Sequence, residues 1–100
     1  MKPIRPHPDH HDLHGITVAV DTHGPRLYVG RCHTIDDDHV HLVDVAVHEA
    51  GEGKASKRDF LEQAAKFGVW KQHDRLRVPC AEVAWIATLG EIAAKGLPQE

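Results

Sequence analysis

One continuous stretch, from Arg26 to Glu49, constrains the fold of this chain more than any other. It reads RLYVGRCHTIDDDHVHLVDVAVHE, with two runs rich in apolar and β-branched residues on either side of an acidic turn, Asp36–Asp38. Such runs around a polar turn are typical of a β-hairpin. Gly30 interrupts the first run, and a glycine within a strand usually marks a bulge, a sharp bend or a close approach of two backbones. The stretch therefore predicts a hairpin whose first strand bends.

Alternation of apolar and polar residues predicts three further strands, one before the hairpin and two after it. They are expected near Ile16–Val20, Leu76–Val78 and Val83–Leu89, followed by a short helix over Leu89–Lys95. In the second strand of the hairpin, either of two sets of side chains can face the core. The sets are Val40, Leu42 and Ala46, or Val43, Val45 and Val47. A strand that is apolar on both sides is expected to be central in its sheet or covered by a partner.

A segment with helical spacing separates the third expected strand from the fourth. Ser56 and Asp59 resemble a capping box in front of it, and Gly68 is suited to end a helix. The sequence predicts a helix from about Lys57 to Phe67, within a helical insert of residues 56–68.

The first fourteen residues contain three prolines and four histidines, with few apolar side chains. We expect them to form an extended arm in front of a domain of residues 15–100. Imidazole and carboxylate groups suit zinc, nickel or copper, so a metal site is one interpretation of the arm, and a solvated polar segment is the other. The candidate metal ligands are His7, His10, His11 and His14.

Size and charge limit the classes of function. One hundred residues form one small domain with a modest core, for which self-association is a natural source of further burial. The net charge of −3 weakens the case for a nucleic-acid binder, although protonation of all ten histidines would bring it to +7. Neither a membrane-spanning stretch nor the apolar core of a secretory signal is visible, so we expect a cytoplasmic protein. Cys32 and Cys80 are then expected as buried or half-buried thiols.

No arrangement typical of an enzyme is visible. The sequence lacks a GxSxG motif, and the loop Gly51–Lys54 lacks the rest of a phosphate-binding motif. We therefore expect neither catalysis nor a cofactor. Trp70 and Trp85 are interpreted as core or interface anchors rather than as stacking platforms.

The order of the elements, with Tyr28-Val29-Gly30 before the aspartates and Leu76–Ile86 after the helix, resembles the Sm-like family. The resemblance covers roughly residues 15–90, and small bacterial members of unassigned function carry a comparable helix before an LRVP-type strand. It implies a mainly β fold: a five-stranded, strongly bent antiparallel SH3-like barrel with a helical insert between the third and fourth strands. It also implies a homo-oligomeric ring in which the last strands of neighbouring subunits pair edge to edge. The residues expected at that interface are Leu76, Val78, Val83 and Trp85.

The resemblance further implies binding of single-stranded RNA, the family's usual activity. We expect no binding to DNA. In RNA-binding members, an Asp and an Asn flank the hairpin turn, and an Arg-Gly pair follows the fourth strand. Here Asp37 matches the Asp, His41 stands in place of the Asn, and Pro79-Cys80 occupies the region of the Arg-Gly pair. His39 is the candidate for stacking on a base. We expect a ring-forming binding or scaffold module, for which RNA binding, a protein–protein interaction and histidine-based metal binding stay open as specific activities.

Overall fold

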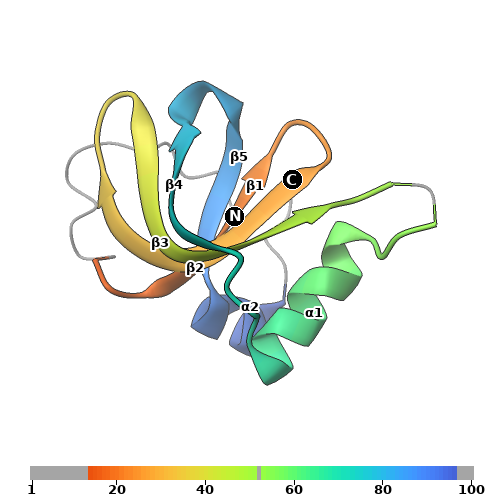
Figure 1. Ribbon diagram of the computed structural model, residues 1–100. Helices are drawn as coiled ribbons and strands as arrows, with labels where there is room; N and C mark the ends of the chain where they lie inside the picture. Colours follow the sequence, from red (N-terminus) through yellow and green to blue (C-terminus); the bar gives the residue numbers. More distant parts are fainter. Residues whose placement is uncertain (1–13, 52, 97–100) are drawn as a thin grey trace.

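The computed structural model describes residues 14–51 and 53–96, and within these ranges five antiparallel strands form one sheet with two helices packed against it (Figure 1). The strand order is β4-β3-β2-β1-β5. The elements are β1 (Thr17–Thr22), β2 (Arg26–Ile35), β3 (His39–Glu49), α1 (Lys57–Phe67), β4 (His73–Pro79), β5 (Val83–Thr88) and α2 (Leu89–Lys95), with a 3₁₀ turn over Cys80–Glu82. The mainly β class, the hairpin and the helical insert predicted from the sequence are confirmed.

Gly30 lies where the backbones of β2 and β3 approach each other closely. A Cβ atom at this position would lie 3.1 Å from the carbonyl oxygen of Val43 and 3.2 Å from the Cα of Val45. The register between the two strands also shifts beside Gly30. Of the features that a glycine within a strand usually marks, the structure shows a close approach of the two backbones and a bulge, whose extra residue lies in β3.

The same bulge changes which side of β3 is buried. Asp44 adopts a φ of 52°, in the left-handed region, opposite the register shift. Before Asp44, the side chains of Val40 and Leu42 face the inner side of the sheet, and after it those of Val45 and Val47 do. Neither set expected from the sequence is therefore right as a whole, because strict alternation holds only up to a bulge. The central position of β3, between β4 and β2, is as expected.

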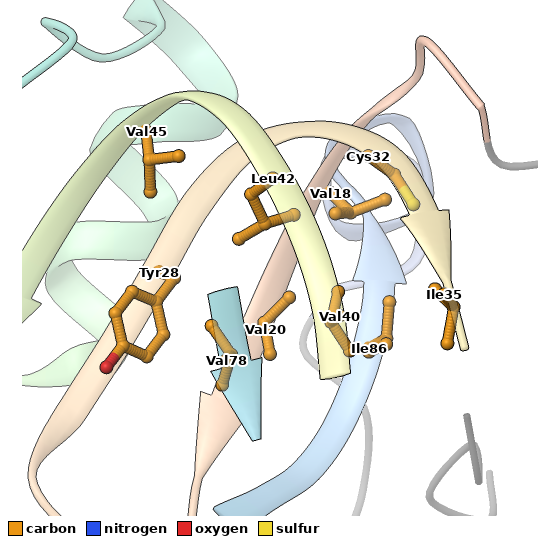
Figure 2. Packing of buried hydrophobic residues seen from close by; sticks show 10 residues of the cluster. All are labelled: Val18, Val20, Tyr28, Cys32, Ile35, Val40, Leu42, Val45, Val78 and Ile86. Atoms are coloured by element: carbon orange, nitrogen blue, oxygen red, sulfur yellow. The ribbon is translucent and has the colours of Figure 1, made fainter. Parts of the chain in front are cut away.

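The sheet bends around a group of buried side chains that we call the inner cluster (Figure 2). Its members are Val18, Val20, Tyr28, Cys32, Ile35, Val40, Leu42, Val45, Val78 and Ile86. Every strand contributes at least one of them, and for the two outermost strands to share one cluster the sheet must curl strongly. Within the described residues, however, β4 and β5 end the strand order without pairing with each other. The structure is thus a strongly bent open sheet, and closure into a barrel is not confirmed.

Both helices lie on the other side of the sheet (Figure 1), over a second group of buried side chains that we call the outer cluster. It consists of Ala19, Leu27, Val29, Trp85 and Ala87 from the strands and Leu61 and Ile92 from the helices. A helix with one apolar face is stabilised mainly by packing of this kind. The helices therefore depend on the sheet that they cover.

The ends of α1 follow from its capping residues. The hydroxyl of Ser56 accepts a hydrogen bond of 3.1 Å from the backbone N–H of Asp59. Gly68 adopts a φ of 78° and donates its N–H to the carbonyl of Ala64. Because glycine takes such a φ without a steric penalty, the helix ends there, and its predicted bounds are confirmed.

Lys57 ties the start of α1 to the β1–β2 turn. Its Nζ lies 2.6 Å from Oδ1 of Asp21, 2.6 Å from the carbonyl oxygen of Gly24 and 3.1 Å from that of Thr22. Asp21 is only 7% exposed. A buried carboxylate needs a partner of this kind, since burial of an uncompensated charge is costly.

Two further expectations concern compartment and redox state. Cys32 is buried and Cys80 half-buried, as the sequence predicts. In the described part of the chain, neither helix has the length and apolar character that crossing a bilayer requires.

Candidate functional site

Asp36 organises the turn between β2 and β3. Its Oδ1 accepts hydrogen bonds of 2.8 Å from the backbone N–H groups of Asp38 and His39, and its Oδ2 accepts one of 2.8 Å from Nε2 of His41. The bond from His41, followed by the two backbone bonds, lowers the pKa of Asp36 from 3.8 to about 2. An aspartate that bonds the backbone two and three residues onward is a common way to fix a tight turn.

The predicted RNA-binding residues are only partly brought together. The rings of His39 and His41 lie on one side of the hairpin, with centroids 6.0 Å apart. Asp37, in contrast, is exposed in the bend of the turn, and the carboxylate beside His41 belongs to Asp36. The preference for aspartate at the first position of a tight turn is the signal that would have singled out Asp36.

The β4–β5 turn lies directly beside the β2–β3 turn. The backbone N–H of Cys80 donates to the carbonyl of Asp38 at 2.8 Å, and its thiol donates to the carbonyl of Asp36 at 3.5 Å. Burial, followed by the charges of the three aspartates, raises the pKa of the Cys80 thiol. A thiol that stays protonated is a poor nucleophile, so Cys80 is suited to joining the two turns rather than to covalent chemistry.

A groove of about 340 Å³ is lined by residues of β2, β3 and β4 and by no residue of the two helices. We call it the basic groove, and its lining residues are His33, His41, Leu42, Val43, Arg75, Leu76 and Arg77. His41 and Arg77 are direct partners across β3 and β4, as are Val43 and Arg75. This groove was not predicted from the sequence, although the alternation of Arg75 and Arg77 with Leu76 places both arginines on one face of the strand.

The metal prediction falls mostly outside the described residues. His7, His10 and His11 belong to residues 1–13, which the structure does not describe. The ring of His14 lies 5.2 Å from that of His33, and His14 also hydrogen-bonds the carbonyl of His33. Across residues 14–51 and 53–96, no three His, Cys, Asp or Glu side chains are grouped to hold a metal ion. A metal site in the arm stays a prediction.

The residues predicted at a subunit interface divide into two kinds. Val78 lies in the inner cluster and Trp85 in the outer cluster, so both are buried within the chain. Leu76 and Val83 are half-buried on the two edge strands, where they pack partly against the inner cluster. Of these four side chains, Leu76 and Val83 keep more apolar surface for a neighbour.

Two aromatic side chains near the end of α1 remain outside both clusters. Phe67 is 78% exposed and Trp70 is 91% exposed. The core role considered for Trp70 is therefore wrong, whereas Trp85 does anchor the outer cluster.

Neither the family models nor the curated proteins compared with this sequence give a match. What the chain offers to a ligand or a partner is therefore read from its geometry. That geometry consists of two strand edges, two adjoining turns, and a groove lined by arginine and histidine.

Proposed function

We propose that this chain is an Sm-like binding or scaffold module that forms a homo-oligomeric ring through its strands β4 and β5. The observation that carries the proposal is the strand order, which makes β4 and β5 the two edges of one strongly bent sheet in the described chain. Edge strands present rows of backbone N–H and C=O groups that can pair with another chain. When the β4 edge of one subunit pairs with the β5 edge of the next, the contact is head-to-tail, and its repetition gives a ring when the rotation between subunits closes.

Partly buried apolar side chains on the two edges support the same assembly. Leu76 on β4 and Val83 on β5 both pack against the inner cluster, yet both remain half-exposed. A neighbouring strand would cover the rest of their surface, and removal of apolar area from water stabilises an interface. The inner cluster would then extend across the subunit boundary.

Light scattering coupled to size exclusion tests the assembly, on protein purified without metal-affinity resin. We expect one discrete mass of about five to eight subunits, as expected for a closed ring. A monodisperse monomer or dimer would rule the ring out.

A pair of variants then locates the interface. Leu76→Lys places a charge at the β4 edge and is expected to shift the mass toward the monomer. Ile16→Lys is the matched control, because Ile16 is 42% exposed but precedes β1, which is not an edge strand. Equal dissociation by both variants would argue against pairing through β4.

Single-stranded RNA is the ligand that we propose for this module. The observation in its favour is the placement of two imidazole rings, His39 and His41, at the β2–β3 turn, since ring systems can stack on unpaired bases. The acidic Asp36–Asp38 segment of the same turn disfavours phosphates, so the backbone of such a ligand needs a different surface. Titration of labelled U-rich and A-rich oligonucleotides tests the proposal, and no binding to either at low salt would contradict it.

A further inference from the structure

In the described part of the chain, the outer side of β4 carries two arginines without an acidic partner. Arg75 and Arg77 alternate with Leu76 and Val78, so their Cα atoms stand about 7 Å apart on one face of the strand. Within residues 14–51 and 53–96, neither arginine forms an ion pair, whereas Arg26 is paired with Glu49. Both side chains are exposed. Their guanidinium groups are therefore available to an anion from solvent.

Acidic side chains on and beside these strands bind partners other than the two arginines. Asp36 is hydrogen-bonded to His41. Asp44 forms ion pairs with Arg31 and, at 3.5 Å, with Lys71. The lining itself contains two arginines and no acidic residue, so it is positively charged although the whole chain carries a net charge of −3. The charge of the groove is thus a local property that the composition of the chain hides.

The remaining walls of the groove suit a nucleotide. His33 on β2 and His41 on β3 contribute two imidazole rings, and Val43 provides an apolar surface between the strands. The volume of about 340 Å³ is at the small end of pockets for small ligands, and it is open to a chain that continues beyond it. Arginine binds phosphate oxygens in a bidentate manner, and rings and apolar surface accept the face of a base.

From this geometry we infer that the basic groove is the site that takes the phosphate groups of the single-stranded RNA, with Arg75 and Arg77 as the phosphate-binding residues. The inference rests on the proposed RNA binding and adds where the backbone of the ligand lies. The rings of His39 and His41 then contact bases only, at the end of the groove that His41 lines.

The test compares two double variants that remove the same charge from an intact fold. Arg75→Gln/Arg77→Gln empties the groove of its arginines. Arg58→Gln/Lys66→Gln is the matched control, because both residues are exposed on α1 and neither lines the groove. Affinity for fluorescently labelled U-rich and A-rich RNA is measured over a range of salt concentrations, and circular dichroism checks that each variant is folded.

We expect the groove variant to lose tenfold or more in affinity, and the slope of log affinity against log salt to fall by about 1.4, since each phosphate contact on a single strand contributes about 0.7. The control should change affinity less than threefold and keep the slope. If the groove variant does not fold, Arg75→Lys/Arg77→Lys takes its place: it keeps both charges and should keep the slope while losing part of the affinity.

The outcomes separate failure of the site from failure of the function. If the wild type binds RNA and the two double variants either preserve the affinity or lower it equally, the groove is not the phosphate-binding site. The proposed RNA binding then still stands. Absence of RNA binding by the wild type overturns both. A lysine variant whose salt slope falls as far as that of the glutamine variant also overturns the phosphate role of the two arginines.

Discussion

The outer side of the sheet has two halves of opposite character. The covered half lies under α1 and α2 and bears the apolar side chains Ala19, Leu27, Val29, Trp85 and Ala87. The open half, over the far end of β2 and over β3 and β4, bears His33, His41, Val43, Arg75 and Arg77. Both halves share one inner cluster on the reverse side of the sheet.

The difference between the halves distinguishes side chains that stabilise the fold from side chains that are exposed to a ligand. The inner cluster packs against the strands of both halves, so we expect the polar residues of the open half to contribute little to the stability of the sheet. The covered half shows that the same sheet surface becomes part of the core when helices reach it. The open half is therefore a surface on which side chains can be chosen for a ligand.

Among these predictions, loss of the Trp85 side chain should lower the stability of the fold most. Trp85 is 6% exposed in the covered half, and Trp85→Ala should lower the free energy of unfolding by about 3–5 kcal/mol. Val43→Ala, in the open half, should cost about 1 kcal/mol or less. Urea denaturation measures both, and similar losses would mean that the two halves are not distinct.

Removal of the Lys57–Asp21 contact between α1 and the sheet is expected to cause the second largest loss of stability. Lys57→Ala leaves the buried carboxylate of Asp21 without its cation and should cost about 2–3 kcal/mol. Lys66→Ala, at an exposed position on the same helix, should stay within about 0.5 kcal/mol of the wild type. Thermal denaturation followed by circular dichroism distinguishes them, and a neutral Lys57→Ala would show that the covered half does not depend on this contact.

Gly30 stands where β2 passes from the covered half to the open half. Gly30→Ala would place a methyl group 3.1 Å from the carbonyl oxygen of Val43, so the two strands must move apart, at a cost of about 1–2 kcal/mol. Gly51→Ala is the control, since a Cβ atom there meets nothing within 4 Å. Chemical denaturation of both variants is the measurement, and equal stabilities would argue against a tight β2–β3 contact.

The smallest expected effect is a pH dependence at the end of the open half. The pKa of Asp36 is about 2, below its ordinary value of 3.8, so its ionised form stabilises the folded chain. This contribution is fully present above about pH 4 and is lost as the pH falls toward 2. The stability difference between wild type and Asp36→Asn should therefore be constant near neutral pH and shrink in acid. Denaturation series at several pH values test this, and a difference that stays constant down to pH 2 would contradict it.

The local elements of this fold can be predicted from the sequence more reliably than the candidate functional site. Ser56 and Gly68 fixed the bounds of α1 because capping depends on nearby residues. The close approach of β2 and β3 at Gly30 was also among the features expected from the sequence. The change of face at Asp44 was not, since a non-glycine residue in the left-handed region leaves no mark in the apolar pattern.

The basic groove could not be predicted from the sequence for a different reason. Its walls come from strands far apart in the sequence, and only the register that pairs His41 with Arg77 brings them together. The alternation of β4 predicted that its two arginines share a face, but not what stands opposite them. Which carboxylate turns toward His41 was not predictable either, because a correspondence of positions does not show it, and in the structure it is that of Asp36.

The position of the groove beside the β4 edge has a consequence for avidity. In the proposed ring, each subunit would carry one copy of the groove at a fixed spacing from the next. An RNA strand held in one groove would meet the neighbouring groove at a high effective concentration, so that a second contact adds affinity without any new type of interaction. Binding would then rise in steps with the length of the strand, and modest affinity at each groove would be sufficient.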